Sequence, residues 1–95
     1  MRDYEFTYIL RPDLEDEDRS AIIQQIQDWI TEAEGAVTNT NHWGLRRLAY
    51  PIDNITEGYY VLVDMQCPPA NVRGLERRLL ISEPILRYLI VRKEE

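Results

Sequence analysis

The chain has 95 residues, of which 44% are hydrophobic and 29% charged, a composition that excludes a disordered or fibrous protein. This length suits one domain, which we expect to span residues 1–95. A single cysteine excludes a disulfide within the chain, and no apolar run approaches the roughly 20 residues of a membrane-spanning helix. With no signal peptide at its start, we expect a cytoplasmic protein.

The net charge of −6 argues at first against a nucleic-acid partner, but the charge is unevenly distributed. Residues 1–41 carry three arginines and ten carboxylates, whereas residues 42–95 carry eight basic and seven acidic side chains. The acidity therefore belongs to the first part of the chain, and the second part is able to form a basic surface.

The first predicted strand covers Arg2–Leu10, where polar and apolar side chains alternate. A period of two that includes aromatic residues is typical of a strand with one buried face. Tyr4, Phe6 and Tyr8 share that face, so we expect them in the core. Pro12 ends the strand because proline lacks the amide donor that a sheet needs.

An amphipathic helix is predicted over residues 15–34, where apolar side chains recur at steps of three and four. Asp13 or Asp16 is placed to cap its first amide groups, and the acidic first turn suits the positive end of the helix dipole. Gly35 follows the last turn, where we expect it to adopt the left-handed conformation that glycine accepts most easily.

Two strands joined as a hairpin are predicted next. Residues Ala36–Ile52 are rich in strand-forming residues, and Gly44 among them indicates a bulge or bend. Residues 51–58 have turn chemistry, and Tyr59–Met65 is predicted as the following strand. Antiparallel pairing is the simplest arrangement for two sequential strands joined in this way.

A second, shorter helix is predicted from Pro69, because proline is tolerated in a first turn. Its apolar stripe consists of residues at helical spacing, Val72, Leu75 and Leu79, with Leu80 as a further candidate. Pro84 then breaks the chain, Ile85–Val91 is predicted as a last apolar strand, and residues 92–95 as a short solvated tail.

The predicted order is β-α-β-β-α-β, which is typical of the ferredoxin-like α+β fold, a four-stranded antiparallel sheet with two helices on one face. From the handedness of the crossovers we expect the first and last strands toward the middle of the sheet and the second strand at an edge.

Nothing in the sequence forms a credible active site. His42, the one histidine, has no ligand partner at metal-binding spacing, and Cys67 has no histidine beside it, so we interpret both as structural. The acidic residues 15–18 lack the glycine and glutamate of a calcium loop, and four isolated glycines build no phosphate-binding loop. We expect no catalytic residue, metal, cofactor or enzymatic activity.

Basic residues at the ends of the predicted sheet are the candidates for RNA contact. We hypothesise one patch from the first and last strands, formed by Arg2, Arg87, Arg92 and Lys93. The alternative, which composition alone favours, is a scatter of charges that keeps the protein soluble. Arg46 and Arg47 lie on the predicted edge strand, where charge either prevents unwanted strand pairing or selects a docking partner.

Three segments carry a family resemblance: GLRRLAYPI over Gly44–Ile52, the opening MRDYE, and ILRP over Ile9–Pro12. In these segments, and over residues 1–93 as a whole, the chain resembles the bacterial small-subunit ribosomal protein six family. The resemblance implies a non-enzymatic, ferredoxin-like RNA-binding protein. It would bind the central domain of small-subunit ribosomal RNA as a pair with ribosomal protein eighteen of the same subunit.

The resemblance also implies site residues. We expect RNA contact by Arg2, Arg87 and Arg92, with a weaker contribution from Lys93, and a partner or RNA interface at Arg46, Arg47 and Tyr50. For Tyr50, a role in packing is the alternative. A basic partner would supply the remaining counterion release, so RNA binding by the chain alone should be weak. The alternative function is a ferredoxin-like ligand-binding or regulatory module that forms homo-oligomers.

Overall fold

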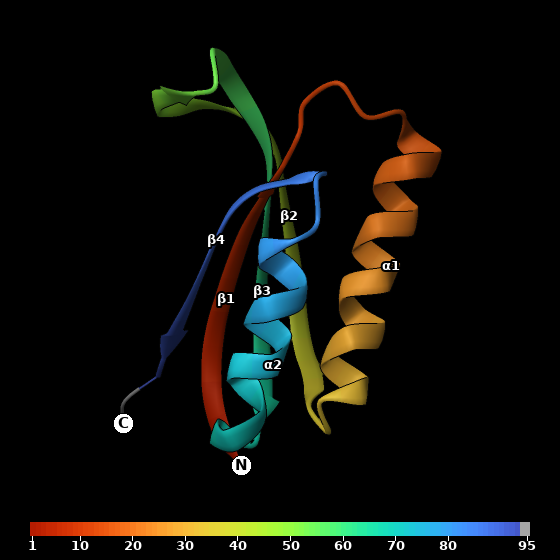
Figure 1. The fold of residues 1–95 in the computed structure, drawn as a ribbon, viewed down its shortest axis with the longest axis vertical. Coiled ribbons are helices and arrows are strands. Elements are labelled where there is room, and N and C mark those ends of the chain that lie inside the picture. Colours follow the sequence, from red (N-terminus) through yellow and green to blue (C-terminus); the bar gives the residue numbers. More distant parts are fainter. Residues whose placement is uncertain (94–95) are drawn as a thin grey trace.

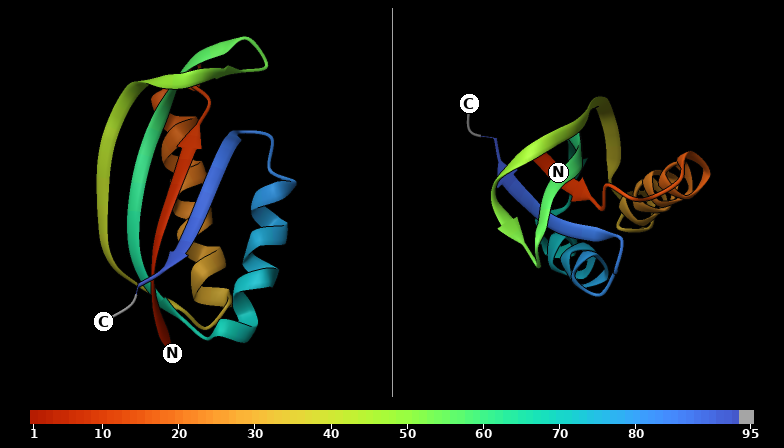
Figure 2. Two further views of the ribbon diagram at one scale, coloured as in Figure 1. Left: turned by 90° about the vertical axis from the view of Figure 1, so that its left-hand side faces the viewer. Right: turned by 90° about the horizontal axis from the view of Figure 1, so that it is seen from above.

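The computed structural model describes residues 1–93, so Glu94 and Glu95 of the predicted tail lie outside the described residues. Its elements follow the predicted order: β1 (Arg2–Leu10), α1 (Asp16–Glu32), β2 (Ala36–Ile52), β3 (Ile55–Cys67), α2 (Pro69–Leu80) and β4 (Ile85–Arg92) (Figure 1). The strands pair antiparallel in one sheet, and both helices cover the same face of it (Figure 2). The ferredoxin-like fold predicted from the sequence is confirmed.

The strand order is β2-β3-β1-β4, which corrects one part of the prediction. The second strand is at an edge as expected, but the last strand is at the opposite edge, because β4 pairs only with β1. Each β-α-β unit leaves a gap one strand wide, and the first strand of the other unit fills it. The middle of the sheet is therefore occupied by β1 and β3, the strands that open the two units.

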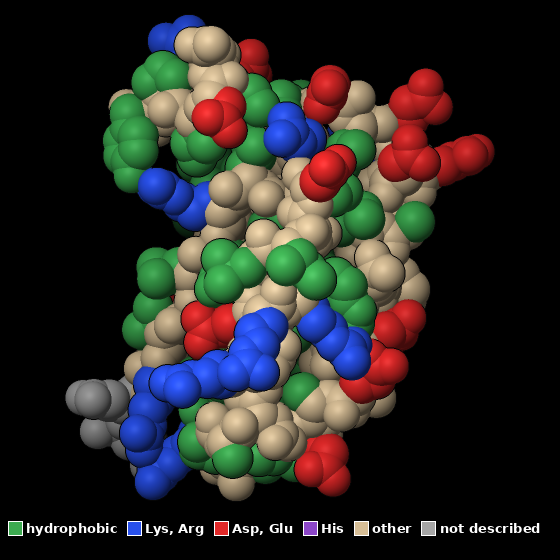
Figure 3. Space-filling view, viewed as in Figure 1, with side chains coloured by type: hydrophobic (Ala, Val, Ile, Leu, Met, Phe, Trp, Pro, Cys, Tyr) green, Lys and Arg blue, Asp and Glu red, His purple; other side chains and the backbone are tan. Residues whose placement is uncertain are grey.

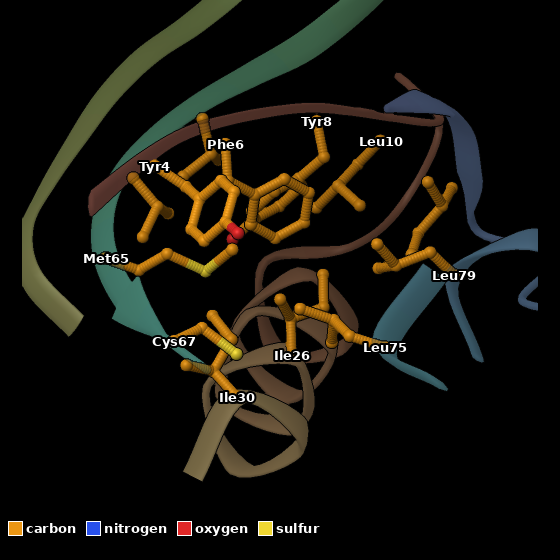
Figure 4. Close-up of a cluster of buried hydrophobic side chains, with 13 residues drawn as sticks. Tyr4, Phe6, Tyr8, Leu10, Ile26, Ile30, Met65, Cys67, Leu75 and Leu79 are labelled. Carbon is orange, nitrogen blue, oxygen red and sulfur yellow. The ribbon is translucent and has the colours of Figure 1, made fainter. Parts of the chain in front are cut away.

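The core lies between the sheet and the two helices (Figure 4). The aromatic face of β1 is buried as predicted, with Phe6 and Tyr8 fully enclosed and Tyr4 nearly so. Helix α1 contributes Ile26 and Ile30, whereas the other buried side chains come from β1, β3, α2 and β4: Leu10, Val61, Val63, Met65, Cys67, Leu75, Leu79 and Ile85. Burial raises the pKa of the Cys67 thiol, which fits the inert, structural role predicted for it.

The ends of α1 differ from the prediction. The residue at the N-cap is Glu15, and its side chain caps no amide group; Asp16 instead pairs with Arg19 at 2.8 Å. At the other end, Glu34 adopts the left-handed conformation with φ 63°, and the amide of Gly35 donates to the carbonyl of Ile30 at 2.9 Å. These contacts form a Schellman motif in which Glu34 is the left-handed residue and Gly35 follows it, whereas the sequence analysis expected Gly35 itself to be left-handed.

The hairpin between β2 and β3 is tighter than predicted. Asp53 and Asn54 alone form its turn, with φ values of 49° and 66°, as a two-residue type I′ turn requires. The strand β3 consequently begins at Ile55, four residues before the predicted start. The bulge expected at Gly44 is confirmed, since its φ is 81° and the register shifts there.

The last of three register shifts in the β2–β3 pairing, between Arg47 and Ile52, separates the far part of the hairpin from the sheet. We call residues 46–57 the arm; it bends out of the sheet plane (Figures 1 and 2). Leu48 of the arm is 8% exposed, as is Ile9 on the sheet face that the helices leave open. Gly58 lies between them, and a Cβ there would stand 2.2 Å from Cγ2 of Ile9, so only glycine fits.

Candidate nucleic-acid interface

Arg2 and Arg92 lie together at one end of the sheet. Arg92 stands opposite Tyr4 in the β1–β4 pairing, and Arg2 is two residues before Tyr4 on the same face of β1. Diagonal neighbours of this kind are about 7–8 Å apart. Both side chains are exposed, and neither forms an ion pair with any residue from 1 to 93. Two guanidinium groups are therefore available for an anion at this end.

Arg87 does not join them, which corrects the expected patch. It stands opposite Ile9, on the open face of the sheet, and five residues of strand put it about 17 Å from Arg92. Its guanidinium donates a hydrogen bond to the hydroxyl of Tyr50 and lies 5.1 Å from that ring's centroid. Strand positions that differ by an odd number, such as 87 and 92, lie on opposite faces, and Arg87 consequently belongs with the arm.

Lys93 also points to the open face, where carboxylates surround it. Its Nζ lies 2.7 Å from Oδ1 of Asp64, and its backbone amide donates to the carbonyl of Asp3. The hydrogen bond from Lys93 lowers the pKa of Asp64, and the same bond raises the pKa of Lys93, with Glu5 and Asp3 acting in the same direction. Because its charge is already compensated, Lys93 is a poor candidate for a phosphate contact.

The arm carries the other predicted interface residues. Arg46, Arg47 and Tyr50 are all exposed, and Arg46 lies 5.7 Å from the ring centroid of Trp43. The Trp43 ring in turn stacks on Tyr60 at 6.5 Å. The structure thus places Tyr50 against Arg87, with Arg46 and Arg47 on the same arm, and this group is distinct from Arg2 and Arg92.

The open face of the sheet also bears apolar side chains that the sequence analysis did not single out. Leu89 and Val91 of β4 are 61% and 48% exposed, and they alternate with Tyr88 and Ile90, which pack on the core. A strand that is apolar on both faces is typical of one whose second face meets another surface. The uninterrupted apolar run Leu89-Ile90-Val91 was the available signal, because it places apolar side chains on both faces of the strand.

Neither His42 nor the groove between the two helices has the arrangement of side chains that a reactive centre requires. His42 lies on β2 with Nδ1 3.3 Å from the hydroxyl of Tyr59, which fits the structural role predicted for it. A groove of about 670 Å³ separates the helices, and its lining carries both signs of charge: Arg73, Arg77 and Arg78 of α2, and Glu32 and Glu34 at the end of α1, of which only Arg78 and Glu32 form an ion pair.

Within residues 1–93, no three His, Cys, Asp or Glu side chains converge as metal ligands would. Over the same residues, neither helix combines the length and apolar composition that crossing a bilayer takes.

Comparison with known proteins agrees with this description. The profile of the ribosomal protein S6 family matches residues 3–92. The small ribosomal subunit protein bS6 of Caldanaerobacter subterraneus subsp. tengcongensis is 45% identical over 95 residues, covering all of both chains. That of Moorella thermoacetica is also 45% identical over 95 residues, covering all of this chain and 97% of its own.

A solved structure is similar over nearly the same range. The crystal structure of 30S ribosomal protein S6 from Thermotoga maritima superposes with a TM-score of 0.92 at 27% identity, covering 97% of this chain and 87% of the other. A match of this extent in both sequence and fold leaves one assignment: the chain belongs to the ribosomal protein S6 family.

Proposed function

We propose that residues 1–95 form one RNA-binding domain, which binds the central domain of small-subunit ribosomal RNA together with ribosomal protein eighteen. The coarser part follows from family membership: the chain is a structural, non-enzymatic protein of the small ribosomal subunit, and its place is on the ribosome in the cytoplasm. The RNA domain and the partner are the proposal.

The observation that carries the proposal is the pair Arg2 and Arg92, which occupy neighbouring positions of β1 and β4 and form no ion pair with a carboxylate of residues 1–93. Guanidinium groups bind phosphate oxygens in a bidentate manner, so this pair suits an RNA backbone. Each phosphate contact contributes through counterion release, and two contacts give only weak affinity. A chain of net charge −6 therefore needs a basic partner to hold RNA.

The open face of the sheet supports the second part. Leu89 and Val91 offer an apolar strip, while the arm beside it offers Tyr50, Arg46 and Arg47. A mixture of exposed aliphatic, aromatic and arginine side chains is typical of the centre of a protein interface. We assign this face to ribosomal protein eighteen, and Arg87 to the border between partner and RNA. Lys93, held by Asp64, contributes least.

The test is equilibrium binding to a central-domain RNA fragment, measured for this chain, for ribosomal protein eighteen and for the two together. We expect weak binding by the chain alone and a gain of tenfold or more for the pair, steeply reduced by salt. An RNA of equal length from another domain is the control. Equal binding to both RNAs, or no gain from the partner, would contradict the proposal.

The same samples test the alternative function. A ligand-binding or regulatory module would sediment as a stable homo-oligomer and would be stabilised by a small metabolite. We expect instead that the free chain sediments chiefly as a monomer.

A further inference from the structure

Helix α2 carries two arginines that take no part in the interfaces described above. Arg73 and Arg77 are both exposed, and neither forms an ion pair or a side-chain hydrogen bond within residues 1–93. They stand four residues apart, hence on the same side of the helix. Glu76, the carboxylate closest to them in sequence, accepts a hydrogen bond from the hydroxyl of Tyr88 at 3.1 Å and is turned toward β4.

This side of α2 adjoins the end of the sheet where Arg2 and Arg92 lie. The helix begins two residues after Cys67, which stands opposite Arg2 in the β1–β3 pairing. It then runs beside β4, to which the Glu76–Tyr88 bond ties it. Lys and Arg side chains accordingly form a nearly continuous band from the lower part of α2 to the ends of β1 and β4 (Figure 3).

The other helix carries the opposite charge. Helix α1 opens with Asp16, Glu17 and Asp18, and acidic side chains gather over it in the same view (Figure 3). Where the two helices face one another, Arg78 of α2 is ion-paired with Glu32 of α1 and lies 5.9 Å from the ring centroid of Trp29. The surface is thus basic over α2 and acidic over α1. Arg78 lies at the boundary between them, where Glu32 neutralises its charge.

We propose that Arg73 and Arg77 bind RNA phosphates, so that the RNA backbone lies along the edge formed by α2 and β4 with α1 turned away from it. This inference rests on the proposed RNA-binding function and extends its contact beyond Arg2 and Arg92. Four residues of helix rise about 6 Å, enough to reach roughly two successive phosphates of one strand along a duplex axis.

RNA is the occupant that the charges favour. The band contains Arg73 and Arg77 and reaches the arginine pair already assigned to RNA, whereas the apolar strip suited to a protein lies on the open face of the sheet. A polyanion placed on the α1 side would meet the acidic first turn of that helix and be repelled. The geometry therefore fixes one orientation, and an acidic protein on α2 is the alternative that the experiment must separate.

The experiment compares neighbouring arginines on one helix. Arg77→Gln and the double change Arg73→Gln/Arg77→Gln remove free cations, while Arg78→Gln removes a cation that Glu32 already neutralises. Each variant, paired with ribosomal protein eighteen, is titrated into the central-domain RNA fragment at several salt concentrations. Melting temperatures of the free variants show whether they fold.

At 0.1 M salt we expect the double variant to bind about tenfold or more weaker, with a salt slope shallower by about 1.5 to 2, and Arg78→Gln to change affinity less than twofold. Unchanged affinity of a folded double variant would overturn the inference while leaving the proposed function intact. So would equal losses for Arg77→Gln and Arg78→Gln, or a loss confined to binding of ribosomal protein eighteen. Failure of the unmodified pair to bind the RNA would instead remove the proposed function.

Discussion

Gly58 shows how a single residue lets the arm close on the sheet. A methyl group there would meet Ile9 at 2.2 Å, so we expect Gly58→Ala to lower the free energy of unfolding by about 1–3 kcal/mol. Gly74 is the matched control, because a Cβ at that helical position meets nothing within 4 Å. Gly74→Ala should raise stability by about 0.5–1 kcal/mol. Urea denaturation measures both, and two changes of the same sign would refute this packing.

The ionisation of Asp64 tests whether its ion pair with Lys93 forms. Because its pKa in the folded protein lies below the ordinary aspartate value of 3.8, Asp64 stabilises the fold above that pH, and the contribution is lost as the pH falls through the lowered pKa. Lys93→Met should therefore raise the pKa of Asp64 toward 3.8, as followed by carboxyl carbon shifts in an NMR titration. An unchanged pKa would show that the pair does not form in solution.

The arm is the element whose position depends most on one contact. Tyr50 meets Arg87 of β4 through its hydroxyl and its ring, and residues 48–51 pair with no strand residue. Tyr50→Ala should release the arm, increasing amide hydrogen exchange over residues 52–57 while changing global stability by no more than about 1 kcal/mol.

Tyr50→Phe keeps the ring over Arg87 and should give intermediate exchange. The amide of Phe6, in the central strand β1, is the internal control and should not change. If exchange in the arm is as slow in Tyr50→Ala as in the unmodified chain, the arm is held by Leu48 and Ile9 alone.

The elements themselves were largely predictable from the sequence, because each is specified by local periodicity. The alternation of β1 and the helical spacing in α1 left little choice. The misplaced details depend on contacts distant in sequence. Gly35, for example, is required by its approach to the carbonyl of Gln66, where a Cβ would stand at 2.7 Å, and not by its own backbone angle. Likewise, nothing local to Ile85–Val91 states that β4 pairs only with β1.

At the scale of the molecule, the family and its general chemistry were predictable, but the grouping of the cations was not. The alternation of side chains along β4 already puts Arg92 on one face of the sheet and Arg87 and Lys93 on the other. The sheet order that we expected nevertheless suggested that all of them form one patch. The structure divides the candidates into Arg2 and Arg92 at one end and Arg87 with Tyr50 at the arm. The acidity of α1 then explains how a chain of charge −6 can still present a basic edge.

The most direct test of this arrangement compares two adjacent residues with the same charge. Arg92→Gln removes a cation that is free within residues 1–93, on the face shared with Arg2, and Lys93→Gln removes one that Asp64 compensates on the opposite face. With ribosomal protein eighteen present, the account predicts that Arg92→Gln weakens binding to the central-domain RNA by roughly eightfold at 0.1 M salt and lowers the salt slope by about one. Lys93→Gln should change the affinity less than twofold. Equal effects of the two substitutions, or a larger effect of Lys93→Gln, would contradict it.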